Sequence, residues 1–348
     1  MSGKYISSAK IIPLDVAVGK VLAHDITEIR PGQFKGPAFK KGHIVKEEDL
    51  AHLRRLGKEH LYVLHLETGE IHEDEAALRL AKALSGPGVI YDKNPSEGKV
   101  ALRSAFRGLL KVHVKALTAL NMIPHVTCSS RHNNVLVDAG EVIAGTRVIP
   151  LIIDEESLHQ AEKITQKVGG LFSIKKMSQP EVGLIITGNE IYHERIEDKF
   201  APLLRKKLHC FHCHLRETVF TPDDKDAIIR EIKAFLTKEV GLILVAGGMS
   251  VDPDDVTRLA IADAGAEDIV YGTPVLPGAM FLYGHLGEIP ILGLPACILY
   301  YKTTVLDLLL PRILAGEAIT REDLAEIAHG GLCLQCEECR YPVCPFGK

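Results

Sequence analysis

Gly241–Thr257, GLILVAGGMSVDPDDVT, decides how the second half of this chain folds. Its apolar run stops at Gly247-Gly248, and a polar loop follows that carries four hydroxyl or carboxyl side chains, Ser250, Asp252, Asp254 and Asp255. A buried parallel strand that leads into a glycine-rich loop and then a helix is how open α/β sheets build ligand sites. The glycines let backbone approach a ligand closely, and the next helix N-terminus favours an anion. The stretch therefore predicts a site for a phosphate or carboxylate.

The aspartates of this loop bear on which ligand fits. Carboxylates repel a phosphate unless a cation lies between them, and Mg²⁺ commonly bridges carboxylate and phosphate oxygens. The alternative is that Asp254 or Asp255 only caps the helix that follows, a frequent role of short acidic residues.

A second loop of the same kind follows another apolar run, Glu181–Thr187, EVGLIIT. This run ends at Gly188-Asn189, before Glu190 and a helical pattern that begins near Ile196. Loops at the carboxyl ends of neighbouring parallel strands converge on one crevice. The two glycine loops are therefore expected to line one pocket.

At these positions the chain resembles the molybdopterin-binding domain of molybdenum cofactor biosynthesis proteins. TGNEI at 187–191 is similar to that domain's TG(D/N)E(L/I) segment, and AGGMSVDPDD at 246–255 is similar to SGGVSVG-x-x-D. TPVLPG at 273–278 and GLPAC at 293–297 fall where the molybdopterin molybdenumtransferase family has KPGKP and GLPGNP. Four segments in the same order are far more specific than one glycine pair. The start of the chain, from Ile12 to Asp25 and near Gly42 to Val45, also resembles that family's start.

The chain departs from the family pattern at several of these positions. Leu276 and Ala279 stand where the KPGKP lysines would be, so this loop lacks the cations expected to hold an oxyanion. Asp252 replaces a glycine, and Ala296-Cys297 replaces the Gly-Asn pair of GLPGNP. The resemblance therefore supports pterin binding more strongly than turnover.

The resemblance implies that the chain binds molybdopterin or adenylylated molybdopterin. The residues that it places at the ligand are Thr187, Gly188, Asn189, Glu190, Gly247, Gly248, Met249, Ser250, Asp252, Asp254, Pro277, Gly278 and Pro295. It also implies that Asp255 binds Mg²⁺ or takes part in the chemical reaction. If the chain is an enzyme, the implied reaction is transfer of molybdate to the adenylylated pterin with release of AMP.

Two other functions remain open at this point. The chain could be a non-catalytic pterin-binding carrier or a redox or metal sensor that serves a molybdoenzyme or another cofactor-biosynthesis protein. A pyridine-nucleotide hydrolase shares the domain type and would act on nucleotides without any pterin. The family's habit of dimerising makes a homodimer a further expectation.

Composition indicates an ordinary globular protein. The chain has 348 residues, 46% hydrophobic and 25% charged, and a formal net charge of −4. An aromatic content of 5% without tryptophan, and no basic stripe, argue against nucleic-acid binding. No segment approaches the roughly 18 consecutive apolar residues of a membrane span, and the first residues lack a signal-peptide core. We therefore expect a cytoplasmic chain without a membrane partner, in which the eight cysteines are thiols or metal ligands.

The fold class expected is α/β, with smaller domains before a three-layer domain whose sheet is mostly parallel. Residues 1–88 are predicted as an α+β region, 89–178 as a β-containing middle domain, 179–330 as the molybdopterin-binding domain and 331–348 as a cysteine-rich tail. In 179–330 we predict strands at 181–187, 215–220, 241–246, 268–271 and 289–294, with an antiparallel edge strand at 281–285. Helices are predicted near 196–208, 223–236, 255–264 and 298–314.

The tail has the ligand spacing C-x2-C-x2-C-x4-C, formed by Cys333, Cys336, Cys339 and Cys344. Four thiolates within so short a stretch can hold Zn²⁺ or an iron–sulfur cluster, and the closing Cys-Pro resembles bacterial ferredoxins apart from the last gap. The alternative is a flexible tail with free thiols.

Two further groups of residues carry weaker signals. His209–His214, HCFHCH, offers many possible ligands, but strand geometry would point them to opposite sides, so packing is the favoured interpretation. Cys297 could touch the ligand or be an inert core thiol. His193 and Arg195 could supply the missing positive charge, although most arginines of this kind are solvated.

Overall fold

The computed structural model describes residues 10–348 except 64, 65, 67, 97, 150, 251 and 254. The chain divides into two compact units. The first holds the chain up to residue 133 together with residues 137–175, and the second holds residues 134–136 and 176–348. The four-part division expected from the sequence stays a prediction.

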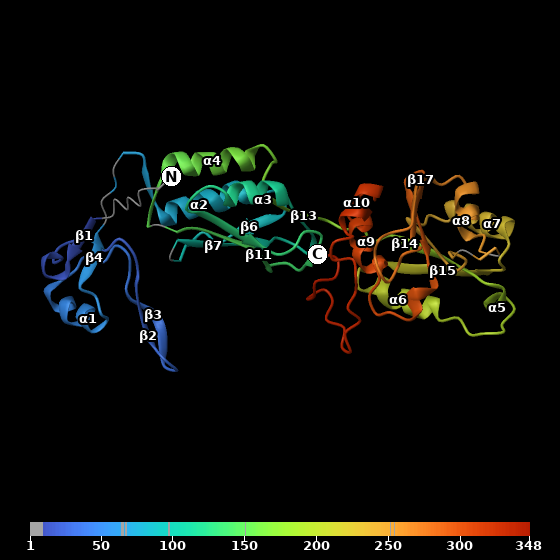
Figure 1. The fold of residues 1–348 in the computed structure, drawn as a ribbon, viewed down its shortest axis with the longest axis horizontal. Helices are drawn as coiled ribbons and strands as arrows, with labels where there is room; N and C mark the ends of the chain where they lie inside the picture. The colour runs from blue at the N-terminus through green and yellow to red at the C-terminus, as the bar shows by residue number, and fades with distance from the viewer. Residues whose placement is uncertain are drawn as a thin grey trace. The chain divides into compact units, whose positions relative to one another are not determined.

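The first unit begins with a small cluster of strands and a short helix (Figure 1). Its elements up to residue 63 are β1 (Lys10–Pro13), η1 (Leu14–Val16), β2 (Ile26–Arg30), β3 (Phe34–Phe39), η2 (Glu47–Asp49), α1 (Leu50–Arg55) and β4 (His60–Val63). β1 pairs antiparallel with β4 over a core that includes Leu22, Leu53 and Leu61. The α+β character predicted for the start of the chain is therefore present, with η2 and α1 directly before β4.

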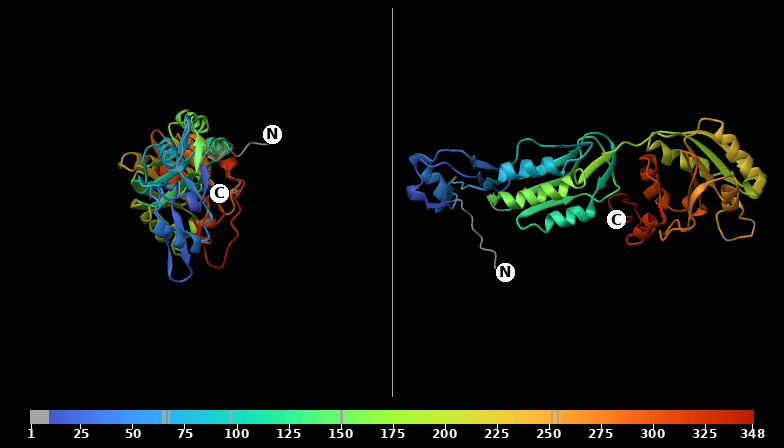
Figure 2. Two further views of the ribbon diagram at one scale, coloured as in Figure 1. Left: turned by 90° about the vertical axis from the view of Figure 1, so that its left-hand side faces the viewer. Right: turned by 90° about the horizontal axis from the view of Figure 1, so that it is seen from above.

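The rest of the first unit sets helices against antiparallel sheets. Its elements are β5 (Glu70–His72), α2 (Glu73–Leu84), β6 (Val89–Tyr91), β7 (Lys99–Ser104), β8 (Gly108–Val112), α3 (Val114–Asn121), β9 (Val126–Ser130), β10 (Leu136–Val137), β11 (Val142–Val148), β12 (Ile152–Asp154), α4 (Glu155–Gln166) and β13 (Phe172–Lys175). One sheet has the order β6-β7-β11-β9, and α2 packs against β7, β11 and α4. Figure 2 shows α2 and α4 alongside each other.

The second unit is an α/β domain built on one six-stranded sheet. Its elements are β14 (Glu181–Thr187), α5 (Asn189–Tyr192), α6 (Phe200–His209), β15 (His214–Thr221), α7 (Lys225–Leu236), β16 (Leu242–Ala246), α8 (Thr257–Asp263), β17 (Glu267–Tyr271), β18 (Leu282–Leu286), β19 (Ile289–Leu294), η3 (Ala296–Leu299), α9 (Val305–Leu314) and α10 (Arg321–Glu326). The strand order is β15-β14-β16-β19-β18-β17. The first four strands are mutually parallel, and β18 is antiparallel to both of its neighbours.

Alternation along β14 explains why helices cover both faces of this sheet. Val182, Leu184 and Ile186 belong to a buried core shared with α6 and α9, whereas Ile185 belongs to a second core shared with α7 and α8. Successive strand residues point to opposite faces, so an uninterrupted apolar strand must be covered on both sides. The expected three-layer α/β architecture is present.

Two local predictions in this unit need correction. The strand predicted at the edge, β18, is antiparallel as expected but lies inside the sheet, and β17 forms the edge. The helix predicted over 298–314 is two elements, η3 and α9, because Thr304 and Asp307 form a capping box that starts a new helix.

Within the described part of the chain, no helix combines the length and apolar character needed to cross a bilayer.

Candidate functional site

A cleft of about 770 Å³ opens where β14, β16 and β19 end, and we call it the main cleft. The end of β14 and the start of α5 contribute Thr187, Gly188, Glu190 and Ile191 to its lining. The loop after β16 contributes Gly247, Gly248, Met249, Ser250 and Asp255. The two glycine loops therefore meet in one cleft, as the parallel-strand argument predicted.

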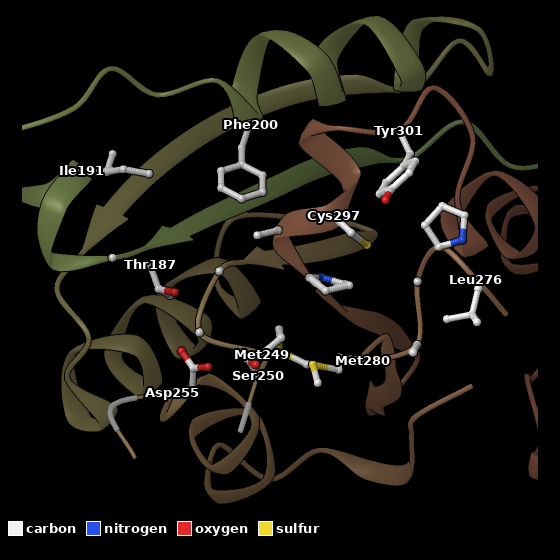
Figure 3. Close-up of a pocket in the computed structure, with 18 of the residues that line it drawn as sticks. Thr187, Ile191, Phe200, Met249, Ser250, Asp255, Leu276, Met280, Cys297 and Tyr301 are labelled. Atoms are coloured by element: carbon white, nitrogen blue, oxygen red, sulfur yellow. The ribbon is translucent and has the colours of Figure 1, made fainter. Parts of the chain in front are cut away.

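Three more segments complete the main cleft. Residues 276–280 form one wall, and Pro295, Ala296 and Cys297 follow β19 at another. In Figure 3, Thr187 and Asp255 lie toward one end of the cleft, whereas Tyr301 and Leu276 lie toward the other. Leu332 and Gln335 of the tail also line the cleft, which the sequence did not predict.

Most of the predicted ligand residues thus share one cavity. Asn189 and Asp252 do not line it, and Asp254 lies outside the described residues. Asn189 instead joins two loops, because its backbone N–H donates to Asp223 Oδ2 at 2.9 Å and its Oδ1 accepts from the Asp223 N–H at 3.3 Å. Asp223 lines the cleft and was missed. It follows β15, so the rule applied to the other strand ends would have found it.

Steric contacts explain the glycine pair. Gly247 has φ 100°, and a Cβ there would lie 2.5 Å from the Thr187 carbonyl oxygen. Gly248 has φ 58°, and a Cβ there would lie 2.4 Å from Thr257 Oγ1. The two threonines are buried and their hydroxyl oxygens lie 3.2 Å apart, so this side of the cleft is fixed by close backbone packing.

The charge of the main cleft is acidic. Glu190, Asp223 and Asp255 line it, and among the described residues no lysine, arginine or histidine does. Arg195 lies at a separate depression with Glu194, Glu197 and Asp198, so it does not supply the positive charge suggested from the sequence. An anionic ligand here would need a cation of its own.

The donor set fits Mg²⁺ that arrives with a phosphate. In the described part of the chain, no three ligand-type side chains are gathered closely enough to form an ion site by themselves. Mg²⁺ is commonly held by one or two carboxylates and by substrate phosphates, keeping several waters, so no closed protein cage is required. The carboxylates of the main cleft are suited to that mode of binding.

Two cysteines of this domain, Cys297 and Cys213, lie in different surroundings. Cys297 lines it, and burial raises the pKa of the Cys297 thiol above its ordinary value. Cys213, in the HCFHCH stretch, is packed in the core, and burial raises its pKa to about 11. The same stretch holds the turn between α6 and β15, where His212 has φ 58°, so its His and Cys side chains belong to different local structures.

Comparison with known proteins identifies part of the chain. Residues 183–315 match the family described as "Probable molybdopterin binding domain". We call this stretch the molybdopterin-family domain. It includes most of the main cleft, whereas Leu332 and Gln335 lie beyond it. Residues 11–65 match a family described as "Domain of unknown function (DUF8806)".

Relatives of the chain include a molybdopterin molybdenumtransferase of Synechococcus elongatus, 24% identical over 147 residues, which are 40% of this chain and 36% of that protein. A protein of Pyrobaculum calidifontis is 32% identical over 92 residues, covering 26% of this chain and 35% of the relative. The chain thus spans about a third of the length of these relatives.

Among solved structures, CinA of Thermoplasma acidophilum, a protein with unknown function, aligns at 17% identity with a TM-score of 0.36, covering 39% of this chain and 98% of CinA. The tungsten cofactor synthesizing protein MoaB of Pyrococcus furiosus aligns at 16% identity with a TM-score of 0.33, covering 40% of this chain and 96% of MoaB.

Proposed function

We propose that the main cleft binds molybdopterin, or its adenylylated form, as a step of molybdenum cofactor biosynthesis. The observation that carries the proposal is that both glycine loops line one cleft inside the molybdopterin-family domain. The volume of about 770 Å³ lies within the range that small-molecule sites occupy, about 300–1,000 Å³.

Each side of the main cleft has a role in this proposal. Backbone at Gly247 and Gly248 approaches the ligand, since neither position has a side chain to stand in the way. Asp255 holds Mg²⁺ against the ligand's phosphate, with Glu190 and Asp223 as further acidic groups. Tyr301 lies at the opposite end of the cleft (Figure 3) and, together with Met280, offers apolar surface for the pterin ring.

The finer proposal is insertion of molybdate into the adenylylated pterin with release of AMP. Asp255 would be the catalytic residue, acting through Mg²⁺ that stabilises charge on the leaving phosphate. Its support is the resemblance of residues 246–255 to the family segment that ends in an aspartate.

A non-catalytic carrier is the second candidate. One observation favours it, namely that no cationic side chain lines the described cleft and that Leu276 and Ala279 are part of its wall. A site without fixed cations stabilises the charge of a transition state poorly, but it can still hold a ligand whose phosphate is neutralised by Mg²⁺.

Single-turnover chemistry separates the two candidates. The full chain is incubated anaerobically with adenylylated molybdopterin, Mg²⁺ and molybdate, and both AMP release and protein-bound pterin are followed. The matched variants are Asp255→Ala in the cleft and Glu288→Ala in the exposed β18–β19 turn, which precedes β19 and so lies at the other end of that strand from the cleft.

AMP release that Asp255→Ala abolishes and Glu288→Ala preserves would support the transferase. Bound pterin without AMP release would support the carrier. Neither bound pterin nor AMP release would refute the proposed function.

A further inference from the structure

The tail, residues 331–348, is folded against the molybdopterin-family domain. The Leu276 N–H donates to the Gly331 carbonyl and the Cys333 N–H donates to the Leu276 carbonyl, both at 2.8 Å. Farther along, Tyr341 Oη donates to the Asp307 carbonyl at 3.0 Å, and Phe346 is 3% exposed within the domain core. The tail is therefore a docked part of the domain.

The end of the tail also meets the residue directly before its start. The Gly347 N–H donates to the Gly330 carbonyl at 2.9 Å. A Cβ at Gly330 would lie 2.2 Å from the Lys348 carbonyl oxygen, and one at Gly347 would lie 2.4 Å from Leu308. The chain between these ends is a closed loop with no helix or strand of its own from Cys333 onward, so its side chains can reorient without breaking regular structure.

All four tail cysteines line one cavity of about 270 Å³, which we call the tail cavity. Residues 300–303 of the domain form its other wall, and Thr303 Oγ1 lies 3.2 Å from Cys339 Sγ. The four thiols are free of disulfides. Their side chains stand apart from one another around the cavity, since among the described residues no three ligand-type side chains lie at metal-binding separation.

The four thiols of the tail cavity are ligands that suit a thiophilic metal. The four thiols border one cavity from a single short loop, so their convergence on one centre requires side-chain rotation and movement of that loop. Thiolate sets of this kind hold tetrahedral Zn²⁺ or an iron–sulfur cluster, and assembly of the coordination sphere with the metal itself is usual for such small sites. Lys302 and Arg340 also line the tail cavity and would offset part of the negative charge of four thiolates.

The tail cavity adjoins the main cleft. Tyr301 and Gln335 line both, and Leu332 next to Cys333 lines the main cleft. Gln335 lies between two of the cysteines, Cys333 and Cys336, so a metal bound by both would hold Gln335 in place.

We propose that Cys333, Cys336, Cys339 and Cys344 bind one thiolate-ligated metal centre in the tail cavity, and that this centre fixes the wall of the main cleft formed by Leu332 and Gln335. The second half of this inference rests on the proposed function. Metal and pterin should then promote each other's binding, because a coupling between two sites acts equally in both directions.

The test compares the full chain with two variants. Cys336→Ser with Cys339→Ser removes two exposed thiols of the tail cavity, and Cys210→Ser removes an exposed thiol after α6 that does not line it. Each anaerobically purified protein is loaded either with Zn²⁺ or with Fe³⁺, sulfide and a thiol reductant, which supplies iron in both oxidation states. Bound metal and maleimide-accessible thiols are then counted, with circular dichroism to check folding and Cys336→Ser alone as a milder variant.

We expect the natural chain and Cys210→Ser to retain one metal centre per chain, and metal binding to protect their tail thiols from maleimide. The variants with serine at the tail cysteines should retain no centre, and their remaining tail thiols should still react with maleimide. Retention of iron with sulfide would identify a cluster, and retention of Zn²⁺ alone would identify a single ion. Equal metal in a folded double variant, no retained metal in the natural chain, or pairing of the tail thiols as disulfides would overturn the inference.

The link to the main cleft is tested by measuring molybdopterin binding before and after chelation of the metal. A several-fold weaker affinity after chelation in the natural chain, and no change in the serine variants, is expected. Unchanged affinity in the natural chain would overturn the link alone. Metal retention without any pterin binding would instead refute the proposed function while leaving the metal centre standing.

Discussion

Gly247 shows how a single residue shapes the main cleft. Its φ of 100° lies in the left-handed region, and its missing Cβ lets the backbone just after β16 pass close to Thr187 at the end of β14. Gly265 has almost the same φ, 99°, but no heavy atom within 4 Å of the Cβ position. A comparison of Gly247 with Gly265 therefore separates the free-energy cost of the backbone conformation from the cost of close contact.

Gly265→Ala is expected to lower the free energy of unfolding by roughly 1–2 kcal/mol, which is the cost of a left-handed conformation for an L-residue. Gly247→Ala should cost about 1–3 kcal/mol more, because its Cβ must push into Thr187. Urea unfolding of both variants measures the difference. Equal losses would mean that the contact at Gly247 relaxes freely.

Leu276 tests the electrostatics of the main cleft. It is 54% exposed on the wall of an acidic cleft, where its backbone rather than its side chain pairs with the tail. Leu276→Lys is expected to raise the affinity for adenylylated molybdopterin several-fold, and added salt should reduce the gain.

Val343→Lys is the matched control for that substitution. Val343 is 83% exposed and does not line the cleft, so the same change of charge should leave affinity unaltered. An equal gain in both variants would assign the effect to net charge instead of to the cleft.

At the scale of elements, a buried arginine joins α9 to α10. Arg312 is 7% exposed and donates to Glu317 Oε2 at 2.8 Å and to Asp323 Oδ1 at 2.5 Å. Burial alone would raise the pKa of Asp323, but the hydrogen bonds from Thr320 and Arg312 outweigh it, and the net pKa lies below the ordinary value. The ionised carboxylate therefore stabilises the fold.

Asp323→Asn should lower the free energy of unfolding by about 1.5–3 kcal/mol at neutral pH, the range for a hydrogen bond to a charged group. Because the folded pKa is depressed, the contribution is complete above the unfolded value of about 3.9 and is lost as pH falls through the folded pKa. The difference in free energy of unfolding between the variant and the natural chain should therefore narrow in acid.

Asp263→Asn provides the comparison for this prediction, since Asp263 pairs with Lys225 at the exposed surface and should contribute much less to the free energy of unfolding than Asp323 does. Urea unfolding across pH measures both variants. If the difference in free energy of unfolding between Asp323→Asn and the natural chain does not narrow below pH of about 3.9, the charge of Asp323 does not stabilise the fold.

Individual elements were predictable to the extent that their signals are local. β14 and β16 follow from short apolar runs, which favour strands covered on both faces. The start of α6 was predicted too early, because Asp198 accepts from the Phe200 and Ala201 N–H groups and the helix begins only at Phe200. The inner position of β18 depends on which strands pair, and that is decided by contacts distant in sequence.

At the scale of the whole molecule, the second unit has a core of its own. Both buried clusters that flank its sheet draw only on residues after 176. The glycine loops of the main cleft were predictable, because each follows its strand directly. The wall supplied by the tail was not, because the pairing of Leu332 with Leu276 joins segments with no shared local pattern.

The most direct test of the central claim is anaerobic titration of the full chain with molybdopterin, using a variant that fills the main cleft. Ala279 is exposed and lines the cleft, whereas Ala262 is exposed on α8 and does not. We predict that the natural chain and Ala262→Trp bind with the same Kd and that Ala279→Trp raises Kd by more than about tenfold, or about 1.4 kcal/mol. Equal binding by both tryptophan variants, or no binding by the natural chain, would contradict the account.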